Sequence, residues 1–351
     1  MELYILSRKD LALLSINKLI DYQINIDEET NAKSTLTLLK ADGLIKGNYA
    51  VLNGLYKQFL FVIDEVILEK DSNVAQLICL DISNIFNRKI IEKNTEDMTT
   101  KSIEEFIIDT MTDNFINSDD PVLNLDFIET NQLTTTQVSV PTNSEDGLYN
   151  FHTFLTNCRQ YKDIYTSIYL SVASQDTTGI KMKLVINVGY RNLSQKMIDT
   201  TLPEVTNYNK IKEEDITAKV TVYIRATGNE YNLYLKNDRT TTTNINDPNR
   251  IFGRVEVISV ETAEEALDEA LNIMKGNRYQ HLVEFNIYKD SKLMDISDLI
   301  IGRPILIKTD DDIYESYISA INIDNSNFVG FKSGNLRSTL TDKLRKKDIG
   351  E

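Results

Sequence analysis

The sequence GNYAVLNGLYKQFLFVIDEVIL, residues 47–68, has a counterpart far along the chain, GRPILIKTDDDIYESYISAINI at residues 302–323. Counted from the leading glycine of each stretch, the matched apolar positions pair Ala50, Val51, Leu52, Phe59, Ile63, Val66 and Leu68 with Ile305, Leu306, Ile307, Tyr314, Ile318, Ile321 and Ile323. Each copy predicts a strand, a tight polar turn at Asn53-Gly54 or Asp310-Asp311-Asp312, and a returning strand, as in a small β-barrel hairpin. The chain is therefore expected to contain one architectural unit twice.

The sequence pattern of residues 1–94 predicts a first compact β-barrel. Alternation such as STLTL at residues 34–38 buries one face of a strand, and Asp42-Gly43 is typical of a turn. The expected strands are Glu2 to Leu6, Asp21 to Asp27, Ser34 to Lys40, Tyr49 to Leu52, Gln58 to Leu68, and Val74 to Leu80.

Residues 95–210 have a mixed pattern. Ser102-Ile103-Glu104-Glu105 is a capping box that opens an amphipathic helix, and a second helix is expected after Glu145-Asp146-Gly147. Strands are predicted at 164–173 and 180–188. This range indicates an α+β domain.

From Asp215 the barrel pattern resumes with a hairpin, Ala218 to Arg225 and Glu230 to Leu235, turned at Gly228-Asn229. A polar loop, a strand and a helix opened by Thr262-Ala263-Glu264-Glu265 then interrupt it. We therefore predict an α+β, predominantly β protein with two similar small β-barrels, the second one discontinuous, and an interposed α+β domain. The expected domains are 1–94 for the first barrel, 95–210 with 238–280 for the middle domain, 211–237 with 281–335 for the second barrel, and 336–351 for a basic tail.

The composition and charge of the chain make some classes of function improbable. The 351 residues carry a formal net charge of −15, which opposes extended contact with nucleic-acid phosphates. Cys79 and Cys158 lie among apolar residues and are expected to be buried thiols. No apolar run is long enough to predict a membrane span, and the first 20 residues do not have the pattern of a signal peptide. We therefore expect synthesis and assembly in the cytoplasm.

The sequence contains two histidines, His152 and His281. His152 lies on the apolar face of a predicted helix, and His281 opens a predicted strand, so both are interpreted as structural residues. A hydrolase triad that includes either of them stays an alternative, because triads assemble in space rather than in sequence.

The acidic clusters are interpreted in the same way. Asp119-Asp120 and Asp310-Asp311-Asp312 fall where turns are expected and lack the spacing of a calcium loop. Glu104-Glu105 and Glu264-Glu265 lie in first helical turns, where carboxylates complete caps. No glycine-rich phosphate loop or Cys/His metal pattern is found. We therefore predict no catalytic, cofactor-binding or metal-binding residues.

One charge feature opposes the acidic trend. The C-terminal stretch carries six cations and a single carboxylate between residues 332 and 347, so it is interpreted either as a solvated terminal helix or as a tail that docks on an acidic neighbour. The candidate docking residues are Lys332, Arg337, Lys343, Arg345, Lys346 and Lys347.

In the order of its segments, the chain resembles the baseplate-hub or tail-tip proteins of tailed bacteriophages, the family that also supplies the amino-terminal part of tail-associated lysozymes and prophage tail endopeptidases. The resemblance covers nearly the whole chain and depends on the order of diffuse motifs. These are the hairpin strand Phe59 to Leu68 followed by ICLDISNIF at 78–86, the helix Ser102 to Ile116, the strand pair Ala218 to Leu235, and the segment from His281 to GNLRSTL at 334–340.

The resemblance implies a virion structural protein rather than an enzyme. It implies a homotrimer whose two barrels per subunit give pseudo-sixfold symmetry, which would adapt a sixfold tail tube to a threefold tip and close or guide the DNA ejection channel. The implied partners are the distal tail or tail-tube ring protein, the tape-measure protein and a distal fibre or receptor-binding protein, with DNA only in transit. Because the sequence stops soon after the second barrel, the lytic activity of some family members is not expected. A carbohydrate-binding module for the host surface is the second interpretation, although the chain has no tryptophan for an aromatic platform.

Overall fold

The protein is described here by a computed structural model. The described residues are 1–28, 32–55, 57–68, 72–91, 101–118, 124–136, 148–176, 179–190, 196–212, 217–238, 240–276, 281–293, 300–309 and 313–334. The chain separates into two compact units. The first contains Met1–Lys196, Ile287–Arg303 and Ala320–Gly330, and the second contains Met197–Asn286, Pro304–Ser319 and Phe331–Glu351.

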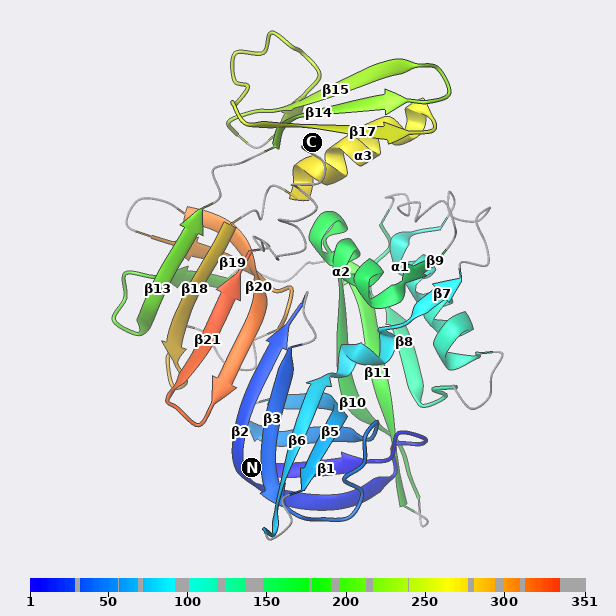
Figure 1. Ribbon diagram of the computed structural model, residues 1–351, viewed down its shortest axis with the longest axis vertical. Coiled ribbons are helices and arrows are strands. Elements are labelled where there is room, and N and C mark those ends of the chain that lie inside the picture. The colour runs from blue at the N-terminus through cyan, green and yellow to red at the C-terminus, as the bar shows by residue number, and fades with distance from the viewer. Residues whose placement is uncertain are drawn as a thin grey trace. The chain divides into compact units, whose positions relative to one another are not determined.

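A closed six-stranded β-barrel forms the beginning of the first unit (Figure 1). Its strands follow the hydrogen-bonded order β1-β4-β5-β6-β3-β2, and β1 pairs again with β2 to complete the circle. Alternation in β3 and β6 places Leu36, Leu38, Ala75 and Leu77 in the core. The strands are β1 (Glu2–Leu6), β2 (Leu13–Asp27), β3 (Lys33–Leu39), β4 (Tyr49–Leu55), β5 (Lys57–Leu68) and β6 (Val74–Asp81).

The barrel is followed in the same unit by the predicted α+β region. Its helices carry aromatic side chains into a core shared with the barrel, where Phe86 meets Phe115 and Phe151 edge to face with ring centroids 5.0 and 5.9 Å apart. Both hydrogen bonds of the predicted capping box open α1, which confirms that prediction. The elements are η1 (Ile82–Phe86), β7 (Lys89–Ile91), α1 (Ile103–Met111), the π-helical turn η3 (Thr112–Ile116), β8 (Ile128–Gln132), β9 (Leu148–Asn150), α2 (Phe151–Lys162), β10 (Ile164–Asp176) and β11 (Gly179–Tyr190).

The repeated hairpin of the sequence is confirmed by strand pairing. β4 pairs antiparallel with β5, and β19 (Pro304–Lys308) pairs antiparallel with β20 (Ile313–Asp324). A shift of 255 positions carries the pair Tyr49 and Val62 onto the pair Pro304 and Tyr317, and the same shift relates the next three pairs of each hairpin. The leading glycines share a left-handed backbone, with φ of +90° at Gly47 and +84° at Gly302. The two segments therefore have the same register as well as the same sequence pattern.

The turn of the first hairpin differs from its prediction. Asn53 and Gly54 lie inside β4, where the pairing register slips, and Leu55 is already opposite Lys57. Glycine tolerates such a local bulge, so the strand continues past the dipeptide that the sequence assigned to the turn. Asp310-Asp311-Asp312 lie outside the described residues.

A second set of six strands repeats the order of the first barrel. Its hydrogen-bonded order is β12-β19-β20-β21-β18-β13, which matches β1-β4-β5-β6-β3-β2 when each set is numbered along the chain. Within the described residues, β12 and β13 do not pair as β1 and β2 do. The added strands are β12 (Lys196–Asp199), β13 (Val205–Lys212), β18 (His281–Tyr288) and β21 (Phe328–Ser333).

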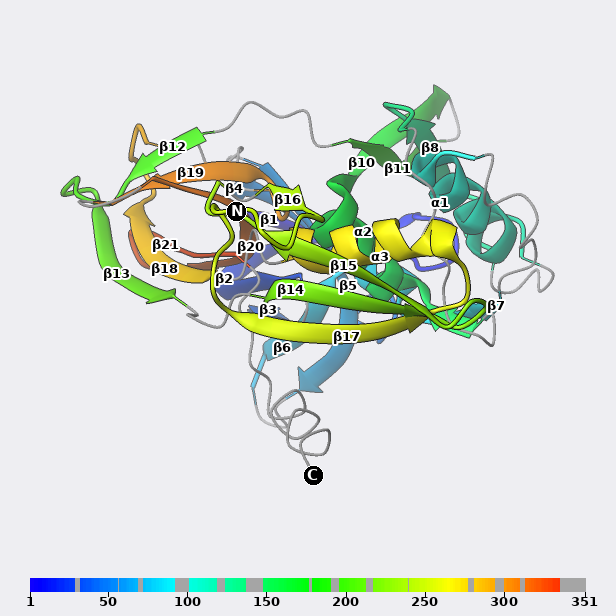
Figure 2. The same ribbon diagram turned by 90° about the horizontal axis from the view of Figure 1, so that it is seen from above.

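The strands between β13 and β18 form a separate sheet, which corrects one expectation. The predicted hairpin, β14 (Thr217–Ile224) with β15 (Asn229–Leu235), exists, but it does not join the second set of strands as expected for residues 211–237. It pairs instead with β16 (Thr241–Thr242) and β17 (Arg254–Val260), and α3 (Ala263–Gly276) packs on it (Figures 1 and 2).

Hairpin alternation is the same in a barrel and in a covered sheet, so the sequence did not distinguish them. We call β14–β17 with α3 the inserted module. β16, β17 and α3 lie in the range 238–280, which was expected to belong with the middle domain, so that expectation is corrected as well. The other predicted domain boundaries stay predictions.

Candidate functional site

A pocket of about 350 Å³ with both polar and apolar lining residues lies in the first unit, where α2 meets the barrel. Asn150 caps α2 by accepting a hydrogen bond from the Thr153 amide at 3.1 Å, so His152, the second residue of the helix, is held in its first turn. Its Nε2 atom lies 3.3 Å from Ser83 Oγ, while the Ser83 hydroxyl donates to Asp81 Oδ1 at 2.6 Å. The pocket therefore contains a serine, a histidine and an aspartate in one hydrogen-bonded group.

The order of this group differs from a hydrolytic relay. In a Ser-His-Asp triad the carboxylate orients the histidine, and the histidine receives the serine proton. Here the carboxylate accepts directly from Ser83, and Asp81 also caps η1 through the Ser83 amide. Burial lowers the pKa of His152, and the nearby Arg159 lowers it further against the opposing effect of Asp81 and Glu28. These contacts join α2 to the barrel.

A buried ion pair borders the same pocket. Arg159 Nη1 lies 3.5 Å from Glu28 Oε2, and the Glu28 side chain is fully buried. A Cβ atom on Gly302 would lie 2.8 Å from Arg159 Cδ, so the glycine allows the segment before β19 to pass close to this arginine. The pair is therefore enclosed by three segments that are far apart in the sequence.

The second histidine lies in another setting. His281 begins β18, is 8% exposed, and its Nε2 atom lies 2.8 Å from Ser316 Oγ. His281 and Ser316 both belong to the second unit, whereas His152 belongs to the first.

Of the predicted docking residues, the structure describes Lys332. It lies in β21, its side chain is half exposed, and its Nζ atom is 2.7 Å from Glu284 Oε1. Arg337, Lys343, Arg345, Lys346 and Lys347 lie outside the described residues.

The acidic candidates have local roles where they are described. Glu105 completes the capping box of α1, and Glu265 accepts from the Glu261 and Thr262 amides before α3. Asp119-Asp120 lie outside the described residues. Within the described part of the chain, no group of three or more His, Cys, Asp or Glu side chains is arranged to hold a metal ion.

Glu104 has a role that the sequence did not predict. Its carboxylate is buried and accepts hydrogen bonds from Thr134 Oγ1 at 2.7 Å and from the hydroxyl and amide of Thr136 at 2.8 and 3.1 Å. It thereby attaches the segment after β8 to α1. Its partners lie about thirty positions away, and no local pattern marks such a contact.

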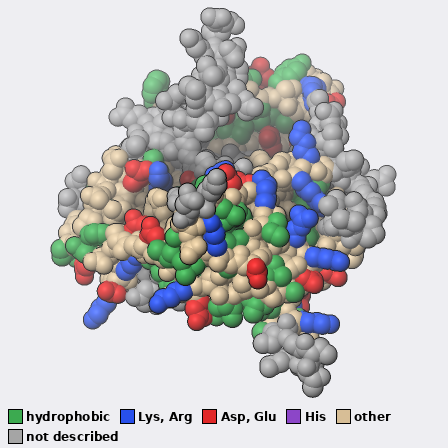
Figure 3. Space-filling view, turned by 60° about the horizontal axis from the view of Figure 1, so that its bottom comes forward, with side chains coloured by type: hydrophobic (Ala, Val, Ile, Leu, Met, Phe, Trp, Pro, Cys, Tyr) green, Lys and Arg blue, Asp and Glu red, His purple; other side chains and the backbone are tan. Residues whose placement is uncertain are grey.

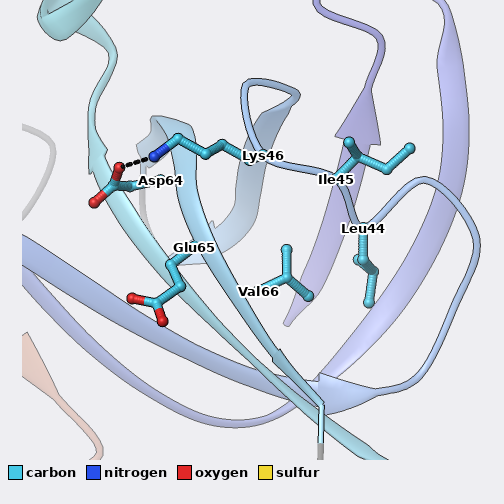
Figure 4. Close-up of a pocket in the computed structure, with 6 residues that line it drawn as sticks. All are labelled: Leu44, Ile45, Lys46, Asp64, Glu65 and Val66. Atoms are coloured by element: carbon cyan, nitrogen blue, oxygen red, sulfur yellow. Dashed lines mark hydrogen bonds and ion pairs between the residues drawn. The ribbon is translucent and has the colours of Figure 1, made fainter.

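An open surface pocket of about 470 Å³ lies beside the bulge of β5 (Figure 4). Lys46 and Lys33 donate to the Asp64 carboxylate at 3.0 and 2.8 Å, and these two bonds lower the pKa of Asp64. Leu44, Ile45 and Val66 also line the pocket, and Figure 4 shows them away from the Lys46–Asp64 pair. On the face drawn in Figure 3, hydrophobic, basic and acidic side chains are interspersed, so this face does not present a field of one sign.

None of the helices in the described residues is long and apolar enough to cross a bilayer.

Comparisons with known proteins agree with the fold described above. No family model matches the sequence, and no curated protein matches it. Among solved structures, the prophage tail protein gp18 from Listeria monocytogenes is similar with a TM-score of 0.55 and 9% identity, over 99% of each chain. The 43 kDa tail protein of prophage MuSo2 from Shewanella oneidensis has a TM-score of 0.53 and 12% identity, with 95% of this chain and 98% of that chain covered. A chain of the phage P2 virion baseplate in its activated conformation has a TM-score of 0.50 and 14% identity, with the same two coverages. The protein therefore has the predominantly β fold of bacteriophage baseplate and tail proteins.

Proposed function

We propose that this protein is a structural component of a bacteriophage tail, a homotrimeric baseplate hub located at the tail tip of the virion. In this role it adapts the sixfold tail tube to a threefold tip and closes or guides the channel through which DNA passes. The strand order shared by β1–β6 and by the second six strands is the observation that carries the proposal. Two similar sets of six strands per subunit, repeated in three subunits, give six similar surfaces around one axis.

The proposed role is non-enzymatic. The Asp81–Ser83–His152 group has the hydrogen-bond order of a structural contact, and His281 lies in a different unit, which supports this proposal. The hub would contact the tail-tube ring protein, the tape-measure protein and a distal fibre or receptor-binding protein. Lys332 and the basic residues that follow it form the proposed docking tail for an acidic surface of one of these neighbours.

Light scattering across a concentration series, combined with negative-stain imaging, tests this function. We expect a trimeric mass and ring-shaped particles with an open axis. A protein that stays monomeric at high concentration and does not bind neighbouring tail proteins would contradict the hub. Binding of the isolated protein to host glycan or cell wall would favour a carbohydrate-binding module. Loss of a hydrolytic activity on replacing both histidines would favour an enzyme.

A further inference from the structure

The turn that leads into each hairpin is repeated in structure as well as in sequence. The Asn48 amide donates to the Ile45 carbonyl at 3.1 Å, and the Arg303 amide, 255 positions later, donates to the Ile300 carbonyl at 3.0 Å. The hairpins that follow share their pairing register. Each position of β5 can therefore be compared with the position of β20 that lies 255 residues later.

β5 and β20 both continue past the strand with which they form a hairpin. β4 reaches Val62 of β5, and β19 reaches Tyr317 of β20. Beyond that point β2 occupies the edge of β20, because Ala320–Asp324 pair antiparallel with Gln23–Asp27 inside the first unit. On β5, by contrast, no strand within the described residues pairs with this edge between Glu65 and Leu68. An open strand edge of this kind is a template for pairing with another chain.

Exposure differs between the two edges as this pairing requires. Ile323 lies opposite Ile24 of β2 and is fully buried, whereas Leu68, its counterpart on β5, is 57% exposed. Ala320 is buried, whereas its counterpart Glu65 is exposed. The residues that β2 covers on β20 are therefore uncovered on β5.

The uncovered edge of β5 borders a groove. It is the pocket of about 470 Å³ drawn in Figure 4, lined by Leu44–Lys46 from the turn and by Asp64–Val66 from β5. At the corresponding place beside β20, Ile300 and Ile321 line one pocket together with residues 26–28 at the end of β2. The chain thus shows what such a groove receives, which is an extended β-strand.

The strand that corresponds to β2 in the second set is β13, at the end of the order β12-β19-β20-β21-β18-β13. β2 pairs with β3 on one edge and with β1 and β20 on the other, whereas β13 pairs, as far as the structure describes the chain, with β18 alone. The open edge of β5 and the open edge of β13 are therefore the counterparts of two edges that pair with each other within the chain. Because β5 and β13 are not paired in one chain, a second copy is needed to bring them together.

We propose that Glu65–Leu68 of β5 in one copy pair antiparallel with β13 of the next copy, as Ala320–Asp324 pair with Gln23–Asp27 within the chain. Main-chain hydrogen bonds of strand addition supply the contact. It joins two different surfaces, so it is head-to-tail and forms a ring when the rotation between copies closes. The inference rests on the proposed trimer and adds to it the two strand edges through which the copies associate.

Cysteine pairs in the full chain test the strand pairing directly. Ile67→Cys is combined in turn with a cysteine at each position of β13 from 206 to 212. Under mild oxidation at least one combination should give covalent dimers and trimers on a non-reducing gel, because paired strands bring Cβ atoms within disulfide reach. Ile67→Cys alone is the control and should stay monomeric on the gel, since the native thiols Cys79 and Cys158 are buried.

A charge placed in the groove tests the contribution of the contact to association. Leu68→Asp puts a carboxylate where its counterpart Ile323 is fully buried, and Val172→Asp on β10 is the matched control, because Val172 is also 57% exposed. Light scattering should show that Leu68→Asp raises the concentration needed for half association by at least about tenfold. Val172→Asp should leave that concentration unchanged, and circular dichroism checks that both variants are folded.

The outcomes separate this contact from the proposed function. A wild-type trimer that gives no cross-link in any combination and persists in Leu68→Asp would overturn the contact and leave the hub intact. Cross-linked copies of a wild type that does not exceed a dimer would support the contact and overturn the trimer, and a wild-type monomer at every concentration would overturn both. If Leu68→Asp does not fold, the cysteine pairs decide. If it stays trimeric but loses a neighbouring tail protein, the groove receives that protein and the inference is wrong.

Discussion

At the scale of single residues, His152 makes the stability of the protein depend on pH. Its pKa is lowered in the folded state by burial first, and then by Arg159. The unfolded chain therefore binds a proton more readily, and stability is lost as the pH falls below the ordinary histidine pKa of about 6.5. The stabilisation is fully present above that value.

We expect His152→Gln to remove part of this dependence. Between pH 6.5 and pH 5 the free energy of unfolding of the wild type should fall more steeply than that of the variant, by at most about 1.4 kcal/mol per pH unit. Urea unfolding at a series of pH values measures the difference, and values above pH 7.5 serve as the reference. Carboxylates with lowered pKa, such as Asp64, act below this window. If the free energy of unfolding varies with pH in the same way for the wild type and the variant, the pKa of His152 does not differ between the folded and unfolded states.

Residues with local partners were the ones that sequence predicted well. The capping box from Ser102 to Glu105 closes within four positions, so its pattern was visible and both of its bonds are present. Glu104, next to it, was interpreted as another helix-start carboxylate. Its hydrogen bonds to Thr134 and Thr136 form because a segment about thirty positions away in the sequence returns to the helix. The residue types alone do not predict such a contact.

At the scale of elements, the glycine that begins the second hairpin has two constraints. Gly302 has a φ of +84°, and an added Cβ would lie 2.8 Å from Arg159 Cδ. Gly228, which turns the hairpin of the inserted module, has a φ of +70°, but its nearest neighbour would be 3.8 Å away. A substitution at Gly302 therefore meets both backbone strain and a close contact, and one at Gly228 meets only the strain.

We expect Gly228→Ala to cost about 1–2 kcal/mol of stability and Gly302→Ala to cost more. Thermal unfolding of the two variants beside the wild type provides the comparison. Equal losses would indicate that the Arg159 side chain moves aside without cost.

The strands themselves were largely predicted, but their sheet was not. Alternating apolar residues located β14 and β15, and Gly228 located their turn. What separates this hairpin from the second set of barrel strands is its parallel pairing with β17, which begins some twenty residues beyond β15. Long-range pairing of this kind is decided by packing against α3, and periodicity within a strand does not report it.

At the scale of the whole molecule, the inserted module interrupts an otherwise repeated order of strands. In the first barrel, β2 ends at Asp27 and β3 begins at Lys33. In the second set, the corresponding β13 and β18 are separated by the whole module. Among the described residues, the core of the module is made by β14, β15, β17, α3 and Ile251 before β17. The module is therefore expected to be dispensable for folding of the remaining chain.

We expect a chain in which a five-residue loop replaces residues 213–280 to remain folded, since the first barrel makes the same connection in five residues. Circular dichroism should retain a β-rich spectrum, and unfolding should remain cooperative with a midpoint close to that of the full chain. Loss of the cooperative transition would mean that the module completes the core of its neighbours.

The common register of the two hairpins also shows where their buried side chains differ. The shift of 255 positions that superimposes the pairings carries Phe61 onto Ser316, and both side chains are buried. One copy fills this place with an aromatic ring, and the other fills it with a hydroxyl beside the imidazole of His281. The same interior position thus depends on apolar volume in one half of the chain and on a polar contact in the other, so we expect that neither side chain alone would be tolerated in the other half.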